Sequence, residues 1–177
     1  HSQHPFSDFL TLAKNLSSTV RVGHRAIVTC TPVPARPLPW PLPYYGSVDS
    51  TPLFIFLCGL YYEKSVDTKW LDDYWPSIVS ALNWCEKYGD LDGDLLIEYE
   101  RKNPAGLMHQ GWKDSRMNHL NFKPPIELVE VQGYYYIALQ TAAEFALMLK
   151  NESLAKSFRE RAEKLKEVFI KDFWRPE

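Results

Sequence analysis

The stretch ELVEVQGYYYIALQTAAEFALMLKN, residues 127–151, is apolar on nearly every side of a helix. A helix with that composition must be covered all round, which predicts an inner, buried position. The next stretch, ESLAKSFRERAEKLKEVFIKDFW (152–174), instead carries charges on one face. Its apolar face is formed by Leu154, Phe158, Ala162, Leu165, Val168 and Phe169. The pair predicts an inner helix followed by an outer, solvated helix.

Residues 50–89 repeat this arrangement. STPLFIFLCGLYYEKS (50–65) offers Ser50 or Thr51 as N-cap, has Pro52 in its first turn, and continues as an apolar helix. DTKWLDDYWPSIVSALNWCEKYG (67–89) has apolar residues at helical spacing and ends at Gly89, although Pro76 is expected to kink or split it. Two inner–outer hairpins are typical of concentric all-α architectures.

Composition narrows the classes of function. The chain of 177 residues has 20 basic and 22 acidic side chains and no basic stripe, which argues against a nucleic-acid partner. No apolar run is long enough to span a bilayer, so no membrane partner is expected. Cys30, Cys58 and Cys85 lack a metal-binding spacing and are typical of reduced thiols in a cytoplasmic protein.

Residues 1–43 differ from the remainder. TPVPARPLPWPLP (31–43) has a proline at nearly every second position, which predicts extended or polyproline-like chain. We therefore expect a Pro-rich lead-in over 1–43 and a helical domain over 44–177.

The connection between the hairpins, residues 89–124, is long and rich in apolar side chains, which favours a functional loop over disorder. It opens with DLDGDLLIEYERK (90–102), where Asp92-Gly93 indicates a turn and LLIEY a short strand, so a small β-hairpin is predicted. The carboxylates of this segment also suit calcium, although the spacing is not that of an EF-hand. These candidate ligands are Asp90, Asp92, Asp94 and Glu98; the alternative is a purely structural turn.

The same loop contains GLMHQGWKDS (106–115). A carboxylic acid that donates a proton at neutral pH needs an apolar neighbour to raise its pKa, and Trp112 could provide this for Asp114. The alternative is that Asp114 merely caps the following segment.

In YYGSVDS (44–50), Asp49 could bind ligand hydroxyls or help to cap the next helix. Polar Glu130 and Gln132 in an apolar helix need partners from other helices or from a ligand.

Three segments in this order, YYGSVDSTPLFI (44–55), YGDLDGDLLIEYERKNPAGLMHQGWKDS (88–115) and EVQGYYYIAL (130–139), resemble the glycogen-debranching-enzyme-like (amylo-α-1,6-glucosidase-like) glycoside hydrolases. That group is related to the trehalase, glucoamylase and processing α-glucosidase families, which share an (α/α)6 toroid. The resemblance covers about residues 44–174. It implies a carbohydrate substrate cleaved at an α-glucosidic bond, with the α-1,6 bond as one candidate, and no cofactor apart from the candidate calcium.

The resemblance also assigns roles. Asp114 matches the general acid, and the residues implied to contact the sugar are Tyr45, Asp49, Gln110, Trp112, Lys113, Glu130 and Gln132. Relatives invert configuration and use a second carboxylate as general base, roughly 6.5–9.5 Å from the acid. In relatives that base lies late in the toroid, and no convincing substitute occurs before Glu177. With about four strong helices, the chain is expected to form part of an (α/α)6 toroid and to self-associate through exposed inner helices.

Two other functions fit the same residues. The chain could be a non-catalytic carbohydrate-binding module, which would bind sugar whether or not Asp114 is ionisable. It could also be a helical scaffold that binds protein through its aromatic face. An inverting α-glycosidase remains the leading hypothesis.

Overall fold

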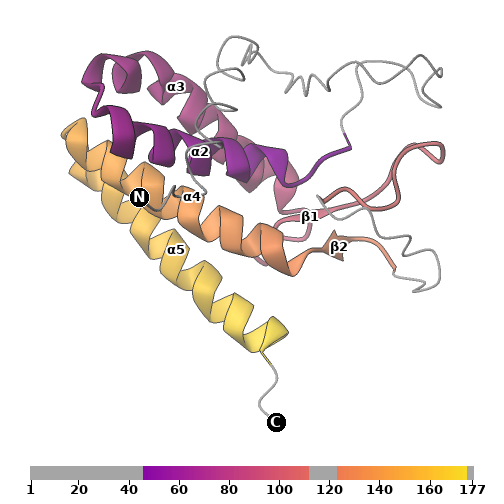
Figure 1. Cartoon of the computed structure of the whole chain (residues 1–177). Helices are drawn as coiled ribbons and strands as arrows, with labels where there is room; N and C mark the ends of the chain where they lie inside the picture. The colour runs from indigo at the N-terminus through magenta and orange to yellow at the C-terminus, as the bar shows by residue number, and fades with distance from the viewer. Residues whose placement is uncertain (1–45, 112–122, 175–177) are drawn as a thin grey trace, which may run out of the picture. The chain divides into compact units, whose positions relative to one another are not determined.

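The computed structural model describes residues 46–111 and 123–174, and four long helices account for most of them. Helix α2 spans Ser50–Ser65 and helix α3 spans Thr68–Trp84, and the two pack together as a hairpin (Figure 1). The turn between them is made by Val66, whose backbone is left-handed, and by Asp67, whose side chain accepts a hydrogen bond from Trp70 N. The end of α2 at Ser65 agrees with the segment predicted from the sequence, whereas its first residue precedes the predicted start.

Helix α3 continues through Pro76, so of the predicted kink or split at this proline the split is wrong. A proline removes one backbone donor, but the flanking turns and the packing of the apolar face keep the helix continuous. Beyond Trp84 the chain makes one wider turn, η1 (Cys85–Gly89), before the long loop begins. This confirms that the helical segment ends at Gly89.

The second hairpin consists of α4 (Val129–Met148) and α5 (Glu152–Phe173). Helix α4 contributes nine buried side chains, whereas α5 buries only Ala155, Ala162 and Leu165 and exposes its charged face. Asn151 accepts a hydrogen bond from Leu154 N and thereby caps α5. The predicted inner and outer helices are confirmed.

The two apolar helices of the hairpins, α2 and α4, contact each other. Gly59 makes the close approach: a Cβ at this position would lie 2.8 Å from Cγ2 of Thr141. One helical turn away, the rings of Tyr62 and Phe145 meet edge to face with centroids 5.4 Å apart. Burial of this interface supplies much of the hydrophobic core.

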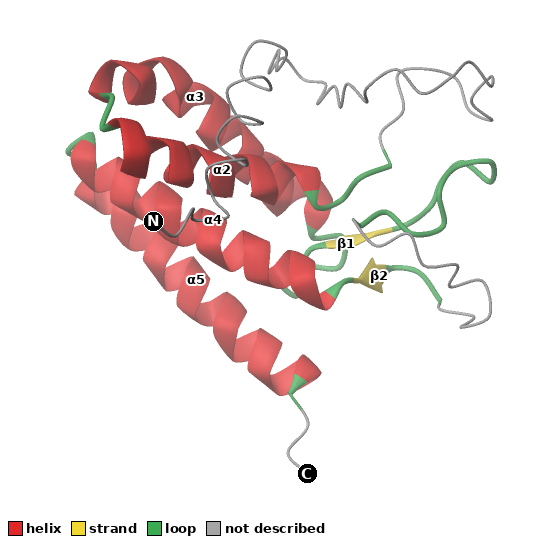
Figure 2. Cartoon of the chain, in the orientation of Figure 1, coloured by secondary structure: helices red, strands yellow, loops and turns green. Residues whose placement is uncertain are grey.

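The long loop contributes a short antiparallel sheet (Figure 2). Strand β1 (Glu98–Tyr99) pairs with β2 (Ile126–Glu127), with Glu98 opposite Glu127 and Tyr99 opposite Ile126. The strand predicted in LLIEY is therefore confirmed, but its partner lies immediately before α4. The turn at Asp92-Gly93, where Gly93 has φ +88°, precedes β1 and does not join the paired strands.

These elements confirm the predicted all-α class, with helical hairpins and a small sheet in the long loop. No helix in the described ranges is long and apolar enough to cross a membrane. The predicted boundary between 1–43 and 44–177 falls outside the described residues.

Candidate functional site

Two segments that are far apart in the sequence meet before the first residue of α2. Val48 N donates a hydrogen bond of 2.9 Å to the carbonyl oxygen of Gln110. Val48 belongs to YYGSVDS and Gln110 to GLMHQGWKDS, the two stretches singled out as candidate site segments. This backbone contact brings two predicted sugar-binding positions, Asp49 and Gln110, to the same end of the helices.

Asp49 occupies the N-cap position of α2 but does not cap the helix with its side chain. Its carbonyl oxygen accepts the first helical hydrogen bond, from Leu53 N at 3.1 Å, while Oδ1 accepts from Ser47 Oγ at 2.6 Å. Prediction of Ser50 or Thr51 as the cap was wrong, because the helix already begins at Ser50. Asp49 is 5 % exposed, so its carboxyl group lies buried at the N-terminus of α2.

Tyr99 connects this region to strand β1. Its hydroxyl donates a hydrogen bond of 3.1 Å to the carbonyl oxygen of Met108. Burial raises the pKa of Tyr99, and the negative charge of Glu130 raises it further, while the backbone of Gln110 acts in the opposite direction. The hydrogen bond to Met108 ties the loop segment that contains Gln110 to β1. Sequence reasoning did not select Tyr99, although an aromatic residue ending a buried strand was a usable indication.

Gln132 is 1 % exposed, and backbone groups engage its whole amide. Its Nε2 donates to the carbonyl oxygens of Ile97, at 2.7 Å, and Leu128, at 3.1 Å. Its Oε1 accepts from Ile97 N at 2.7 Å. Gln132 thus joins the first turn of α4 to the residue before β1. Both amide donors of Gln132 are used by these bonds, so it supports the backbone on which the candidate site is built.

The loop leading to the predicted acid is held tightly where it is described. At Gly111 a Cβ would lie 2.6 Å from Cδ1 of Leu128, so a side chain there would displace the residue that precedes α4. Trp112, Lys113 and Asp114 follow directly, and they lie outside the described residues, as does Tyr45. Val48 is bonded to Gln110 and Gly111 lies against Leu128, so the segments that contain Asp49, Gln110 and Glu130 meet here.

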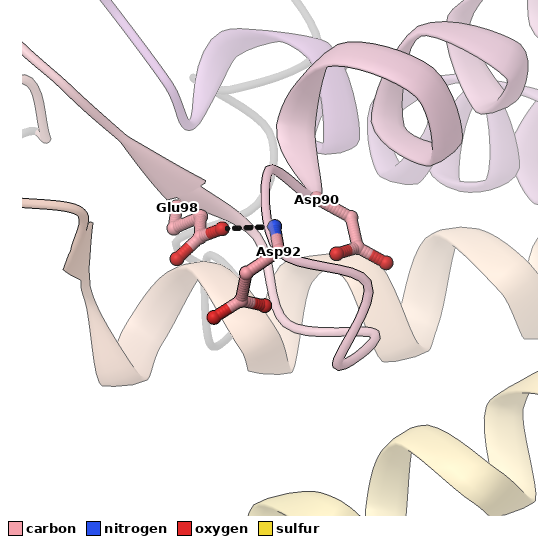
Figure 3. Close-up of side chains that lie close together, drawn as sticks. All are labelled: Asp90, Asp92 and Glu98. Atoms are coloured by element: carbon pink, nitrogen blue, oxygen red, sulfur yellow. Dashed lines mark hydrogen bonds between the residues drawn. The ribbon is translucent and has the colours of Figure 1, made fainter.

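Three of the four predicted calcium ligands come together in the loop before β1. Oxygen atoms of Asp90, Asp92 and Glu98 lie within 4.8 Å of one another (Figure 3). Asp94 is turned to its own loop, where its Oδ1 accepts a hydrogen bond from Leu96 N at 2.8 Å. The residues thus combine a hydrogen-bonded turn with a compact group of carboxylates.

Two helical hairpins joined by a long loop define an all-α protein built of hairpins. A family model described as the bacterial alpha-L-rhamnosidase 6 hairpin glycosidase domain matches residues 7–177, and the chain belongs to this family. The finding supports the six-hairpin glycosidase group that the resemblance indicated, while the matched family is the rhamnosidase one and not the debranching-enzyme-like one. No curated protein and no solved structure matches the chain.

Proposed function

We propose that the chain forms part of an inverting α-glycosidase in which Asp114 protonates the glycosidic oxygen of the departing sugar. Membership of a six-hairpin glycosidase family supports glycoside hydrolysis in general. The observation that carries the finer proposal is the hydrogen bond between Val48 and Gln110. It joins the segment of Asp49 to the loop that continues, four residues on from Gln110, to Asp114.

The chemistry requires a proton donor at neutral pH and a second carboxylate that activates water. For Asp114, the indole of Trp112 would supply the apolar neighbour that keeps the carboxyl protonated, while an approach of Lys113 would favour the anion. A second carboxylate close to Asp114 would act in the same direction as the indole, since like charges disfavour ionisation.

The sugar would be held by hydroxyl contacts with the carboxylates of Asp49 and Glu130 and with Gln110. Tyr45 and Lys113 would complete the contacts, and Trp112 would offer a face for the sugar ring. Gln132 would act on these residues indirectly, since it fixes Ile97 and Leu128. In this proposal the contacting groups come from three places in the sequence that the described backbone brings together.

Two substrate classes follow from different observations. The family match over residues 7–177 favours an α-L-rhamnoside, because that is the substrate named in the family description. The debranching-enzyme-like segments favour an α-glucoside, including an α-1,6 bond. Rhamnose has a methyl group where glucose has a hydroxymethyl group, so an apolar contact at that carbon favours rhamnose and a hydrogen-bonding contact favours glucose.

Sugar binding can be followed through backbone amide resonances in the 177-residue chain, titrated with L-rhamnose, D-glucose and their α-linked disaccharides. We expect saturable shifts centred on Val48 and Gln110. Asp49→Asn should weaken binding by about tenfold or more, the loss of one charged hydrogen bond. Asp73→Asn, an exposed carboxylate on α3, is the matched control and should bind as the unmodified chain does.

If neither sugar shifts the amide resonances, the proposed function is wrong and a protein-binding scaffold is favoured. Saturable binding would be consistent with two hypotheses, an enzyme and a non-catalytic binding module. They differ in turnover by the protein that carries this sequence: the enzyme hydrolyses an α-glycoside and loses this activity in Asp114→Asn, whereas the module binds the sugar without cleaving it.

A further inference from the structure

The loop from Asp90 to Glu98 brings three carboxylates close together, and the backbone hydrogen bonds that they accept do not cancel their negative charge. Asp90, Asp92 and Glu98 present oxygens within 4.8 Å of one another, and Figure 3 shows the carboxylates of Glu98 and Asp92 on the same side of the loop. Backbone N–H groups donate to several of these oxygens. Gly93 N and Leu95 N donate to Oδ1 and Oδ2 of Asp90, at 2.7 and 3.1 Å.

Glu98 is the member of the cluster that a turn does not explain. It is 2 % exposed, and its Oε1 accepts hydrogen bonds from Leu91 N, at 2.7 Å, and Asp92 N, at 3.0 Å. Its second oxygen, Oε2, is buried and has no hydrogen-bond partner. Among the described residues, no basic side chain forms an ion pair with Glu98. A buried carboxylate oxygen without a hydrogen-bond partner is energetically costly. A cation bound next to Oε2 would offset this cost.

Further carboxylates surround it. Glu127 is the cross-strand partner of Glu98, and Asp94 lies in the same loop. Like charges held this close repel one another unless a proton or a cation is shared between them.

We propose that Asp90, Asp92 and Glu98 bind a divalent cation of the calcium type. All three donors are carboxylate oxygens, and the group contains no histidine or cysteine, which suits a hard cation and not zinc. A carboxylate oxygen has more than one lone pair, so oxygens that accept N–H groups of the loop can still ligate. The irregular, solvent-facing loop suits the variable coordination of Ca²⁺ better than the strict octahedron of Mg²⁺.

The cation would act on the candidate sugar site through β1. Glu98 is the first residue of β1 and Tyr99 is the second, and the Tyr99 hydroxyl holds the carbonyl oxygen of Met108. A cation that fixes the loop before β1 therefore also fixes the anchor of residues 108–111. The proposal itself concerns binding of the metal and stands independently of the glycosidase proposal.

The test is calorimetric titration of the chelator-treated chain with CaCl₂, together with thermal melting with and without the metal. We expect one Ca²⁺ to bind with Kd on the order of 10⁻⁵ to 10⁻³ M, a higher melting temperature in its presence, and weaker binding of Mg²⁺. Asp92→Asn should weaken Ca²⁺ binding by about tenfold or more while the chain stays folded, because Asp92 is exposed. Asp73→Asn is the control of equal charge change and should bind as the unmodified chain does.

Glu98→Gln provides the second variant. Its neutral side chain should relieve the repulsion without metal and abolish the Ca²⁺-dependent rise in melting temperature. Absence of heat and of any melting shift at millimolar Ca²⁺ would overturn the proposal. So would binding that is equally strong in Asp92→Asn, because the ion would then lie elsewhere. If Glu98→Gln fails to fold, Asp92→Asn against Asp73→Asn still decides the outcome.

Discussion

Replacement of Gln132 by leucine should destabilise the chain more than almost any other single polar-to-apolar change. The side chain is 1 % exposed and forms two hydrogen bonds with Ile97, both of 2.7 Å, and a third of 3.1 Å with the carbonyl oxygen of Leu128. Ile97 is itself fully buried, so its N–H and carbonyl groups lose these partners without gaining water.

The expected loss follows from those two backbone groups. A buried donor or acceptor left without a partner costs about 1–3 kcal/mol, so the free energy of unfolding should fall by about 2–5 kcal/mol. That is a large part of the roughly 5–15 kcal/mol that stabilises an ordinary domain. The released Ile97 would also loosen β1 and thereby the contact of Tyr99 with Met108.

Urea unfolding followed by circular dichroism measures this loss as a lower midpoint at an unchanged slope. Gln140→Leu is the matched control, because it makes the same exchange on the same helix at an exposed glutamine, bonded to the Tyr136 hydroxyl at 2.8 Å. It should change the free energy of unfolding by no more than about 0.5 kcal/mol. Equal effects of the two replacements, or a loss below about 1 kcal/mol for Gln132→Leu, would refute the role given to Gln132.

Three further outcomes are expected. Gly59→Ala places a Cβ against Thr141 and should destabilise the chain by about 1–3 kcal/mol, and adding Thr141→Ala should recover most of this loss in a double-mutant cycle read by urea unfolding. Burial raises the pKa of Cys58 and Cys85 from 9.0 to about 12, so both thiols should resist iodoacetamide at pH 8 in the folded chain and react in urea, as mapped by mass spectrometry. Because the fold favours the neutral thiols, stability is complete below pH 9 and should fall as pH rises from 9 towards 12, by about 1.4 kcal/mol per pH unit for each thiol. Asn151→Ala removes the cap of α5 and should lower the free energy of unfolding by about 1 kcal/mol in the same urea assay.

The helices could be predicted because their determinants are local. Apolar periodicity and end signals within residues 50–65 and 152–173 are enough to indicate α2 and α5, and the nearly continuous apolar character of 129–148 indicates the inner position of α4. The N-cap of α2 was predicted one or two residues late. The carboxylate of Asp49 is engaged by Ser47 and leaves the cap to the backbone, which no propensity reveals.

For the site, the sequence indicated candidate residues but not how they lie relative to one another. Asp49 and Glu130 were selected from their surroundings in the sequence and Gln110 from the family resemblance. The pairing of Val48 with Gln110 spans the whole first hairpin and has no local pattern. The same applies to Gln132, whose partner Ile97 lies 35 residues away. The pairing of β1 with β2 was likewise not foreseen, because a turn signal at residues 92–93 suggested a nearer partner.

The proposed function depends most on Asp114 as the proton donor. The dependence of the hydrolysis rate on the leaving group tests this role most directly. In the protein that carries this sequence, the hydrolysis of alkyl and dinitrophenyl α-glycosides should be compared between the unmodified protein and the Asp114→Asn variant. We expect kcat/KM of the variant to fall by about 10²–10⁴-fold for the alkyl glycoside, whose leaving oxygen needs a proton, and to change far less for the dinitrophenyl glycoside, whose leaving group does not. An equal loss on both substrates, or no loss on either, would contradict the assignment.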